Sequence, residues 1–198
     1  MDSLTLDYIR EKIAESIKTK QLIYNDEVLL AKIMQVAERS VEAFKSGNKV
    51  ILAGNGGSAA DAQHIAAEFV SRFEFDRPGL PSISLTTDTS MLTAIGNDYG
   101  YEMLFSRQLE ANAKAGDIFI GISTSGNSAN ILKAMNTAKE MELVSVGLGG
   151  ASGKLQSVSD YCISVPSVST PRIQESHILI GHIICGMVER AIFSGTHA

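Results

Sequence analysis

Two glycine- and serine-rich turns constrain the fold of this chain more than any other feature. One is Gly-Asn-Gly-Gly at residues 54–57, and the other is Ser-Thr-Ser-Gly-Asn-Ser at residues 123–128. Each follows a short apolar run typical of a buried strand and precedes a segment with helical spacing. Turns of this kind lie at the carboxyl ends of parallel strands, where ligands of open α/β sheets bind. We therefore predict an α/β protein with a ligand site at these two turns.

Hydrophobic patterning predicts five strands, at residues 49–53, 82–85, 117–122, 143–148 and 161–165. Helices are expected over residues 58–73, 89–95, 101–113, from the second turn to about residue 141, and over 154–158 and 174–193. Residues 4–46 predict two further helices that break near Tyr24–Asp26, where Asn25 or Asp26 can cap the second. We expect one domain over residues 1–198, an α/β fold in which a five-stranded parallel sheet is flanked by helices, with residues 1–47 as a helical N-terminal extension.

Composition limits the classes of function. The 198 residues suffice for one domain with a core, and 44% hydrophobic and 20% charged residues are typical of a soluble globular protein. The net charge of −5, without a basic block, argues against nucleic-acid binding. The first residues do not resemble a signal peptide, and the apolar stretch 178–188, interrupted by His182, is too short to cross a membrane. Cys162 and Cys185 are therefore expected to be reduced, buried thiols in a cytoplasmic protein.

The two turns carry groups that suit a phosphate. Backbone N–H groups and the helix dipole favour an anion at such a position, and the second turn adds four hydroxyls, from Ser123, Thr124, Ser125 and Ser128. The dinucleotide fingerprint fails because Ala59 stands where it needs a glycine, and no Walker sequence occurs. The simpler alternative is a pair of tight turns, with Ser128 as a plain N-cap. Two such turns in one chain favour a phosphorylated ligand that is not a nucleotide.

Acid–base side chains follow the first turn. His64 and Glu68 are four residues apart, so they share the face of a helix that begins at the proposed phosphate site. On the last expected helix, Glu175 and His182 are nearly aligned, whereas His177 lies about 140° from His182. Helical geometry does not select between the two histidines, and His182 among isoleucines also suits a hydrogen-bonded core residue.

Four segments together resemble the bacterial phosphoheptose isomerase family, which has the sugar-isomerase (SIS) fold. They are Gly-Asn-Gly-Gly-Ser-Ala-Ala-Asp-Ala-Gln-His at 54–64, Gly-Asn-Asp-Tyr-Gly-Tyr-Glu at 96–102, the 123–128 turn, and Pro-Arg-Ile-Gln-Glu-Ser-His at 171–177. The likeness covers nearly the whole chain. The 123–128 turn alone identifies only the broad fold, which is flavodoxin-like, whereas His64, Glu68, Gln174 and His182 together are more specific.

The resemblance implies an aldose–ketose isomerase that converts sedoheptulose 7-phosphate to D-glycero-D-manno-heptose 7-phosphate, the first step toward the ADP-heptose of lipopolysaccharide and other surface polysaccharides. It also implies a homotetramer with active sites at subunit interfaces and one zinc ion per subunit, bound by His64, Glu68, Gln174 and His182. By matched position, the residues in contact with substrate are Asn55, Gly56, Gly57, Ser58, Glu68, Asn97, Asp98, Ser123, Thr124, Ser125, Ser128 and Gln174. Some members have an acid where this chain has Pro171, so no sugar contact is expected there.

Isomerisation of an α-hydroxy ketone moves a proton between C1 and C2 through an enediol. A carboxylate in a desolvated pocket suits that transfer, which makes Glu68 the candidate base, and the His182 imidazole is the candidate for the proton that moves between the oxygens. Zinc would polarise the carbonyl. The alternative is a non-catalytic SIS-domain protein, either a sugar-phosphate sensor or a tetramer that associates with a replication initiator. Such a protein would not need the four acid–base and metal side chains.

Overall fold

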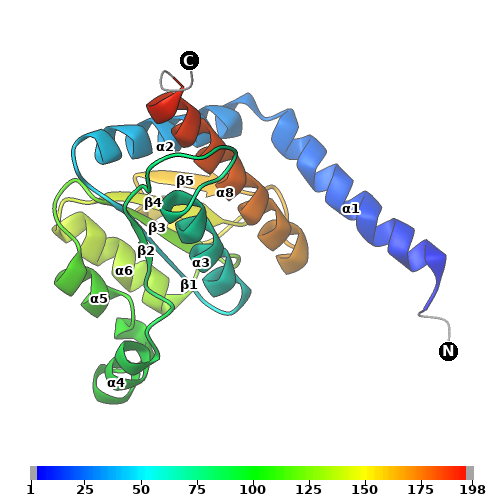
Figure 1. Ribbon diagram of the computed structural model, residues 1–198. Helices are drawn as coiled ribbons and strands as arrows, with labels where there is room; N and C mark the ends of the chain where they lie inside the picture. The colour runs from blue at the N-terminus through cyan, green and yellow to red at the C-terminus, as the bar shows by residue number, and fades with distance from the viewer. Residues whose placement is uncertain (1–3, 195–198) are drawn as a thin grey trace.

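Five parallel strands form one sheet in the order β2-β1-β3-β4-β5 in the computed structural model, which describes residues 4–194 (Figure 1). The strands are β1 (Val50–Gly54), β2 (Ser82–Ser84), β3 (Ile118–Ser123), β4 (Val144–Gly149) and β5 (Tyr161–Ser164). Each strand boundary differs by at most one residue from the expected one. The predicted five-stranded, flavodoxin-like parallel sheet is confirmed, and β1 and β3, which precede the two turns, are neighbours in it.

Helices cover both faces of this sheet. In residues 4–194 they are α1 (Leu6–Tyr24), α2 (Glu27–Lys45), α3 (Gly57–Val70), α4 (Thr89–Tyr99), α5 (Ser106–Asn112), α6 (Ala129–Glu140), α7 (Leu155–Val158) and α8 (Thr170–Phe193), with one 3₁₀ turn, η1 (Tyr101–Met103). Because successive side chains of a strand point to opposite faces, Val50 and Leu52 pack under α2, α3 and α8, whereas Ile51 and Ala53 pack under α5, α6 and α7. The result is a buried sheet between two hydrophobic cores.

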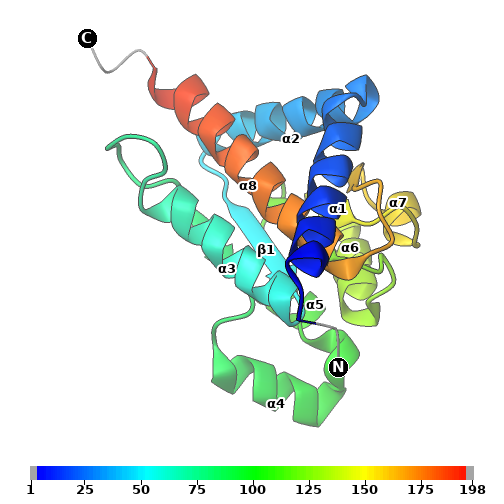
Figure 2. The ribbon, with the colours of Figure 1, turned by 90° about the vertical axis from the view of Figure 1, so that its right-hand side faces the viewer.

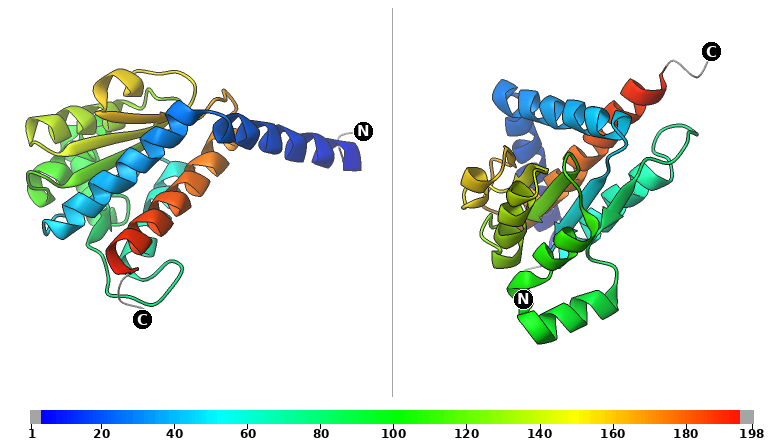
Figure 3. Two further views of the ribbon diagram at one scale, coloured as in Figure 1. Left: turned by 90° about the horizontal axis from the view of Figure 1, so that it is seen from above. Right: turned by 90° about the vertical axis from the view of Figure 1, so that its left-hand side faces the viewer.

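The first two helices differ in how they meet the sheet. Figure 2 shows α2 and α8 side by side, and Figures 1 and 3 show α1 extending away from the body. Asp26 caps α2 as expected, since its side chain accepts a hydrogen bond from the Leu29 N–H at 3.0 Å. Along α1, Ile9, Ile13 and Ile17 recur every four residues and are each more than half exposed.

The expected boundaries of four helices were wrong. Helix α3 ends at Val70 rather than 73. Helix α8 begins at Thr170 rather than 174, because Pro171 occupies its first turn, where a missing N–H costs nothing. Helix α4 continues through Gly96 and Asn97 to Tyr99 and ends at Gly100, with φ of 91°. The single helix expected over 101–113 is divided into η1 and α5.

Helix α8 is also long and apolar enough to cross a membrane by length and composition. The apolar stretch 178–188 was expected to be too short for this, but the helix that contains it has 24 residues. Half of its most apolar 18-residue window is buried inside the protein, against α2, α3 and the sheet. This is the behaviour of a core helix.

Candidate functional site

The second turn, residues 123–128, is called the hydroxyl turn below. Its serine hydroxyls converge: Ser123 Oγ lies 2.8 Å from Ser128 Oγ and 3.4 Å from Ser125 Oγ. Ser123 is buried at the end of β3, whereas Ser125 is exposed and accepts a hydrogen bond from the Asn127 N–H at 3.2 Å. The turn therefore presents a compact group of hydroxyls at the carboxyl edge of the sheet.

Three of the helices that begin at this edge, α3, α6 and α8, lack side-chain caps. Ser128 occupies the N-cap position of α6, but its hydroxyl bonds to Ser123 and makes no cap hydrogen bond. The same lack of a side-chain cap holds for α3 and α8, whereas Thr5, Asp26 and Asp88 cap α1, α2 and α4. Free N–H groups at a helix N-terminus attract an anion. Ser128 is therefore not a plain N-cap, and the hydroxyl turn suits a phosphate.

The first turn is joined to the hydroxyl turn by an amide pair. Asn55 and Asn130 donate to each other, at 2.9 Å and 2.8 Å, and the Tyr101 hydroxyl donates to Asn55 Oδ1 at 3.0 Å. Asn130 is in the first turn of α6 and almost completely buried. Sequence reasoning missed Tyr101 and Asn130 as partners of Asn55, although both lie in or beside the motifs that it used.

The side-chain amide of Gln174, a residue of α8, lies against the beginning of α3. A Cβ on Gly57 would come within 1.8 Å of Gln174 Nε2, so a larger residue at position 57 would displace this amide. Gly56, the N-cap of α3, precedes it, and Ser58 is buried in the first turn of the helix. The Gln174 amide therefore lies about 10 Å along the α3 axis before His64, at the end of the site near the first turn.

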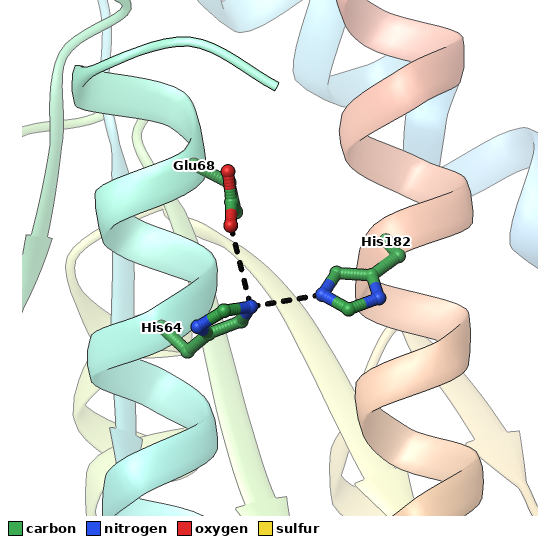
Figure 4. Close-up of side chains that lie close together, drawn as sticks. All are labelled: His64, Glu68 and His182. Carbon is green, nitrogen blue, oxygen red and sulfur yellow. Dashed lines mark hydrogen bonds and ion pairs between the residues drawn. The ribbon is translucent and has the colours of Figure 1, made fainter. Parts of the chain in front are cut away.

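His64, Glu68 and His182 form a second group, called the His–Glu cluster below (Figure 4). His64 Nε2 lies 2.9 Å from His182 Nε2 and 3.3 Å from Glu68 Oε1. Figure 4 shows the three side chains pointing into the space between α3 and α8. One ligand atom from each residue lies within 4.8 Å of the others.

A glycine allows α3 and α8 to approach closely beside this cluster. A Cβ on Gly181 would come within 2.5 Å of Ile65 Cδ1, and these residues are the immediate neighbours of His182 and His64. The Phe73 ring then stacks on the His182 ring, with centroids 5.4 Å apart and planes inclined by 29°. Packing outside the cluster thus determines how close its two histidines come.

The donor set fits a divalent transition metal. Two imidazole nitrogens and one carboxylate oxygen are ligands that zinc accepts, and three protein ligands with an open position are typical of catalytic zinc sites. The Gln174 amide is not at the cluster in this structure, because it lies against Gly57. The structure thus provides a possible metal site of His64, Glu68 and His182.

His177 lies elsewhere, as the helical geometry predicted. It is completely buried, and its Nε2 lies 3.1 Å from the Gly149 carbonyl oxygen. Burial lowers the pKa of His177 to about 4, and the hydrogen bond to Gly149 offsets only part of that effect. The neutral ring donates to Gly149 and does not contribute to the His–Glu cluster.

Two residues predicted to contact substrate, Asn97 and Asp98, lie on α4, at the outer rim of the site. Asn97 and Asp98 are exposed near the end of that helix, and Asn97 Nδ2 donates to Asp98 Oδ1 at 2.7 Å. Figure 1 shows α4 standing apart from the sheet, below the body in that view. A cavity of about 300 Å³ separates α4 from the first turn and is lined by Asn55, Gly56, Thr93 and Tyr101, among others.

Asp61 was not singled out from the sequence, yet it lies one turn before His64 on α3. Its Oδ2 is buried without a hydrogen-bond partner among residues 4–194. Burial raises the pKa of Asp61 to about 6, and the nearby His64 lowers it by less. A perturbed carboxyl group beside the cluster is typical of functional sites.

Known proteins resemble this chain over most of its length. The family model of the SIS domain matches residues 19–150. Phosphoheptose isomerase of Aneurinibacillus thermoaerophilus is 67% identical over 188 residues, which cover 94% of this chain and 95% of the relative. Phosphoheptose isomerase 2 of Campylobacter jejuni is 63% identical over 187 residues, which cover 94% and 93%. The solved structure of a phosphoheptose isomerase from Francisella tularensis has a TM-score of 0.90 at 38% identity and covers 93% of this chain and 98% of that one.

Proposed function

Because the chain belongs to the phosphoheptose isomerase family of SIS-domain proteins, we propose that its site converts sedoheptulose 7-phosphate to D-glycero-D-manno-heptose 7-phosphate. The protein is an aldose–ketose isomerase of heptose synthesis. The observation that carries this proposal is the pairing, in one chain, of an uncapped hydroxyl turn with the His–Glu cluster. The non-catalytic alternative has no use for that cluster and is not favoured.

We propose that the substrate phosphate binds at the hydroxyl turn. Ser123, Thr124, Ser125 and Ser128 supply hydroxyls, and the N-terminus of α6 supplies free N–H groups and the positive end of a helix dipole. Asn55, Gly56, Gly57 and Ser58 contact the sugar from the first turn, with Gln174 beside them; Asn97 and Asp98 contact it from the rim. A hydroxyl turn separate from the cluster suits a substrate whose phosphate and reacting carbons are at opposite ends.

We propose that zinc binds to His64, Glu68 and His182. Three protein ligands leave a fourth position of a tetrahedral site for a substrate oxygen, or for Gln174 once its amide has moved from Gly57 toward the ion. Bound there, the ion would supply Lewis acidity that polarises the substrate carbonyl. The support is the donor set and its separations, 2.9 Å and 3.3 Å between the ligand atoms.

The proton transfers are assigned to two side chains of the cluster. We propose that Glu68 takes the proton from C1 and returns it to C2, because its carboxylate is partly buried and Oε1 alone faces His64. His182, which is held by the Phe73 ring, moves the second proton between the two substrate oxygens.

We also propose that the protein is a cytoplasmic homotetramer whose subunits share active sites. The isoleucines of α1 that face away from the body, Ile9, Ile13 and Ile17, are the surface that a second copy would cover. An exposed apolar stripe of this kind marks an interface, and closed symmetric assemblies are the usual form of soluble oligomers.

Turnover of sedoheptulose 7-phosphate by the purified protein tests the function. We expect conversion to the heptose phosphate, loss of conversion after treatment with a zinc chelator, and recovery when zinc is returned. Folded protein that carries zinc and yet gives no conversion would leave the non-catalytic reading as the better one. Light scattering at micromolar concentration tests the assembly, and a monomer would contradict the proposed tetramer.

A further inference from the structure

A buried ion pair links the segment after α3 to helix α8. Arg77 Nε donates to Glu189 Oε1 at 2.9 Å, and both side chains are almost completely buried. Glu189 also accepts hydrogen bonds from the N–H groups of Phe73, at 2.9 Å, and Glu74, at 2.7 Å. Burial alone would raise the pKa of Glu189, but these hydrogen bonds and the charge of Arg77 outweigh it, so the pKa is lowered. Glu189 is therefore ionised at neutral pH.

Arg77 also holds the end of α3. Its Nη2 donates to the Glu68 carbonyl oxygen at 2.7 Å, and its Nη1 donates to the carbonyl oxygens of Phe69 and Ser71, at 2.6 Å and 3.1 Å. A cation that satisfies the last carbonyls of a helix stabilises its C-terminus. One guanidinium thus fixes the backbone of the last turn of α3, including the backbone of Glu68, against α8.

The Arg77–Glu189 pair is also linked to His182, through Phe73. The N–H of Phe73 is bonded to Glu189, and the ring of Phe73 stacks on the His182 ring. Glu189 is seven residues after His182, so the two lie two turns apart on α8. Two members of the His–Glu cluster are therefore positioned by groups that contact Arg77 or Glu189.

We propose that the Arg77–Glu189 pair is a positioning element for the metal site, which holds the Glu68 carboxylate and the His182 imidazole at the separation that the ion needs. The inference rests on the proposed metal site. Neither residue touches the ion; both act through the Glu68 backbone and the Phe73 ring. Removal of groups that orient metal ligands typically weakens metal binding by 10- to 100-fold.

A matched control is the buried carboxylate of Asp117, which lies before β3. Asp117 is completely buried and accepts hydrogen bonds from the N–H groups of Lys49 and Lys114 and from Lys49 Nζ. Glu189 and Asp117 thus have the same kind of environment, two backbone donors and one cation. Asp117 precedes β3, at the edge of the sheet opposite the two turns. Glu189→Gln and Asp117→Asn therefore remove equivalent charges, and only the first contacts groups that hold the cluster.

The experiment measures the zinc dissociation constant of the whole protein by competition with a chromogenic chelator. It also records the visible spectrum of the cobalt-substituted protein, which reports ligand geometry. Both variants should unfold at lower denaturant concentration than the parent. Glu189→Gln should raise the zinc dissociation constant at least tenfold and change the cobalt spectrum, whereas Asp117→Asn should leave both within twofold of the parent. Equal zinc affinity in the parent and folded Glu189→Gln would overturn the inference, as would equal weakening in both variants.

Two milder variants decide the question if Glu189→Gln does not fold. Arg77→Lys keeps the charge but cannot reach all the carbonyl oxygens, and Phe73→Leu removes only the ring stacked on His182. Each should raise the zinc dissociation constant several-fold, and parent-like values in both would reject the positioning role. Failure of the parent protein itself to bind zinc would instead reject the metal site, so the two failures are distinct.

Discussion

The hydroxyl turn and the His–Glu cluster are built in opposite ways. The hydroxyl turn is six consecutive residues between β3 and α6, and its groups contact one another within that segment. The cluster joins residues 118 positions apart, and a glycine contact, a stacked ring and a buried ion pair outside it determine its geometry. The proposed phosphate site is therefore formed by one local segment, whereas the geometry of the proposed catalytic site depends on how two helices pack.

This difference separates the effects that substitutions should have. A change in the hydroxyl turn removes contacts to the phosphate, which a bound substrate and a transition state share, so it should act mainly on KM. A change in the cluster, or in the packing that supports it, should act on kcat and on metal affinity. The predictions below follow this division, from the largest effect to the smallest.

Loss of the acid–base groups should give the largest effect. Glu68→Gln and His182→Gln keep the approximate size of each side chain, and each should lower kcat by a factor on the order of 10²–10⁴. Steady-state kinetics with zinc-loaded protein measures this. A change in KM alone for either variant would place the chemistry elsewhere.

His177 should make the fold sensitive to acid without affecting the cluster, although it lies on the same helix as His182. In the unfolded chain the His177 ring has a pKa of 6.5, whereas in the folded chain burial lowers that pKa to about 4. The free energy of unfolding should therefore fall, by about 3 kcal/mol in all, as pH drops through this window. Urea unfolding at several pH values should show this loss in the parent protein and not in His177→Gln.

The same variant provides a control for the site assignment on α8. His177→Gln can still donate to the Gly149 carbonyl and should keep most of the activity. A folded His177→Gln protein with the activity loss expected for His182→Gln would show that the wrong histidine had been assigned to the site.

The glycine contact between α3 and α8 tests whether packing controls the cluster. Gly181→Ala would place a Cβ 2.5 Å from Ile65 Cδ1, so the helices must separate or Ile65 must move. Overpacking of this kind should lower the free energy of unfolding by about 1–3 kcal/mol, less the gain in helix propensity, and should weaken zinc binding. Gly186→Ala is the control, because its Cβ would meet the Phe73 ring only at 3.4 Å. Equal zinc affinity in the two variants would contradict the argument.

The smallest effect is expected where the two turns meet. Tyr101→Phe removes one hydrogen bond to Asn55 Oδ1 and leaves the amide pair with Asn130 intact. The loss should be about 0.5–1.5 kcal/mol, seen as a modest rise in KM with unchanged kcat. A large fall in kcat would mean that Tyr101 serves the chemistry directly.

The sheet and the hydroxyl turn could be predicted from the sequence because their signals are local. Short apolar runs followed by glycine or serine mark the strands and both turns, and the order of elements then implies a parallel sheet. Even the face shared by His64 and Glu68 follows from their spacing. The start of α8 was expected at residue 174 but lies at Thr170, because proline is well tolerated in the first turn of a helix.

The rest of the site depends on tertiary packing. Arg77 and Glu189 are 112 residues apart, and nothing near either residue in the sequence indicates that they pair. The contact between Gln174 and Gly57, and the hydrogen bond between Tyr101 and Asn55, likewise join separate elements. The family resemblance indicated Asn55, Gly57 and Gln174, but their contacts follow only from how the elements pack.

The central claim is that the hydroxyl turn binds the phosphate and the His–Glu cluster acts on the reacting carbons. Its most direct test compares two substrates. Steady-state kinetics of the parent protein and of Ser125→Ala are measured with sedoheptulose 7-phosphate and with sedoheptulose, which lacks the phosphate. Ser125→Ala should lower kcat/KM for the phosphorylated sugar by about tenfold, as expected for loss of a hydrogen bond to a charged group, and should leave kcat/KM for sedoheptulose unchanged. An equal loss with both sugars would contradict the account, because it would place Ser125 at the reacting carbons rather than at the phosphate.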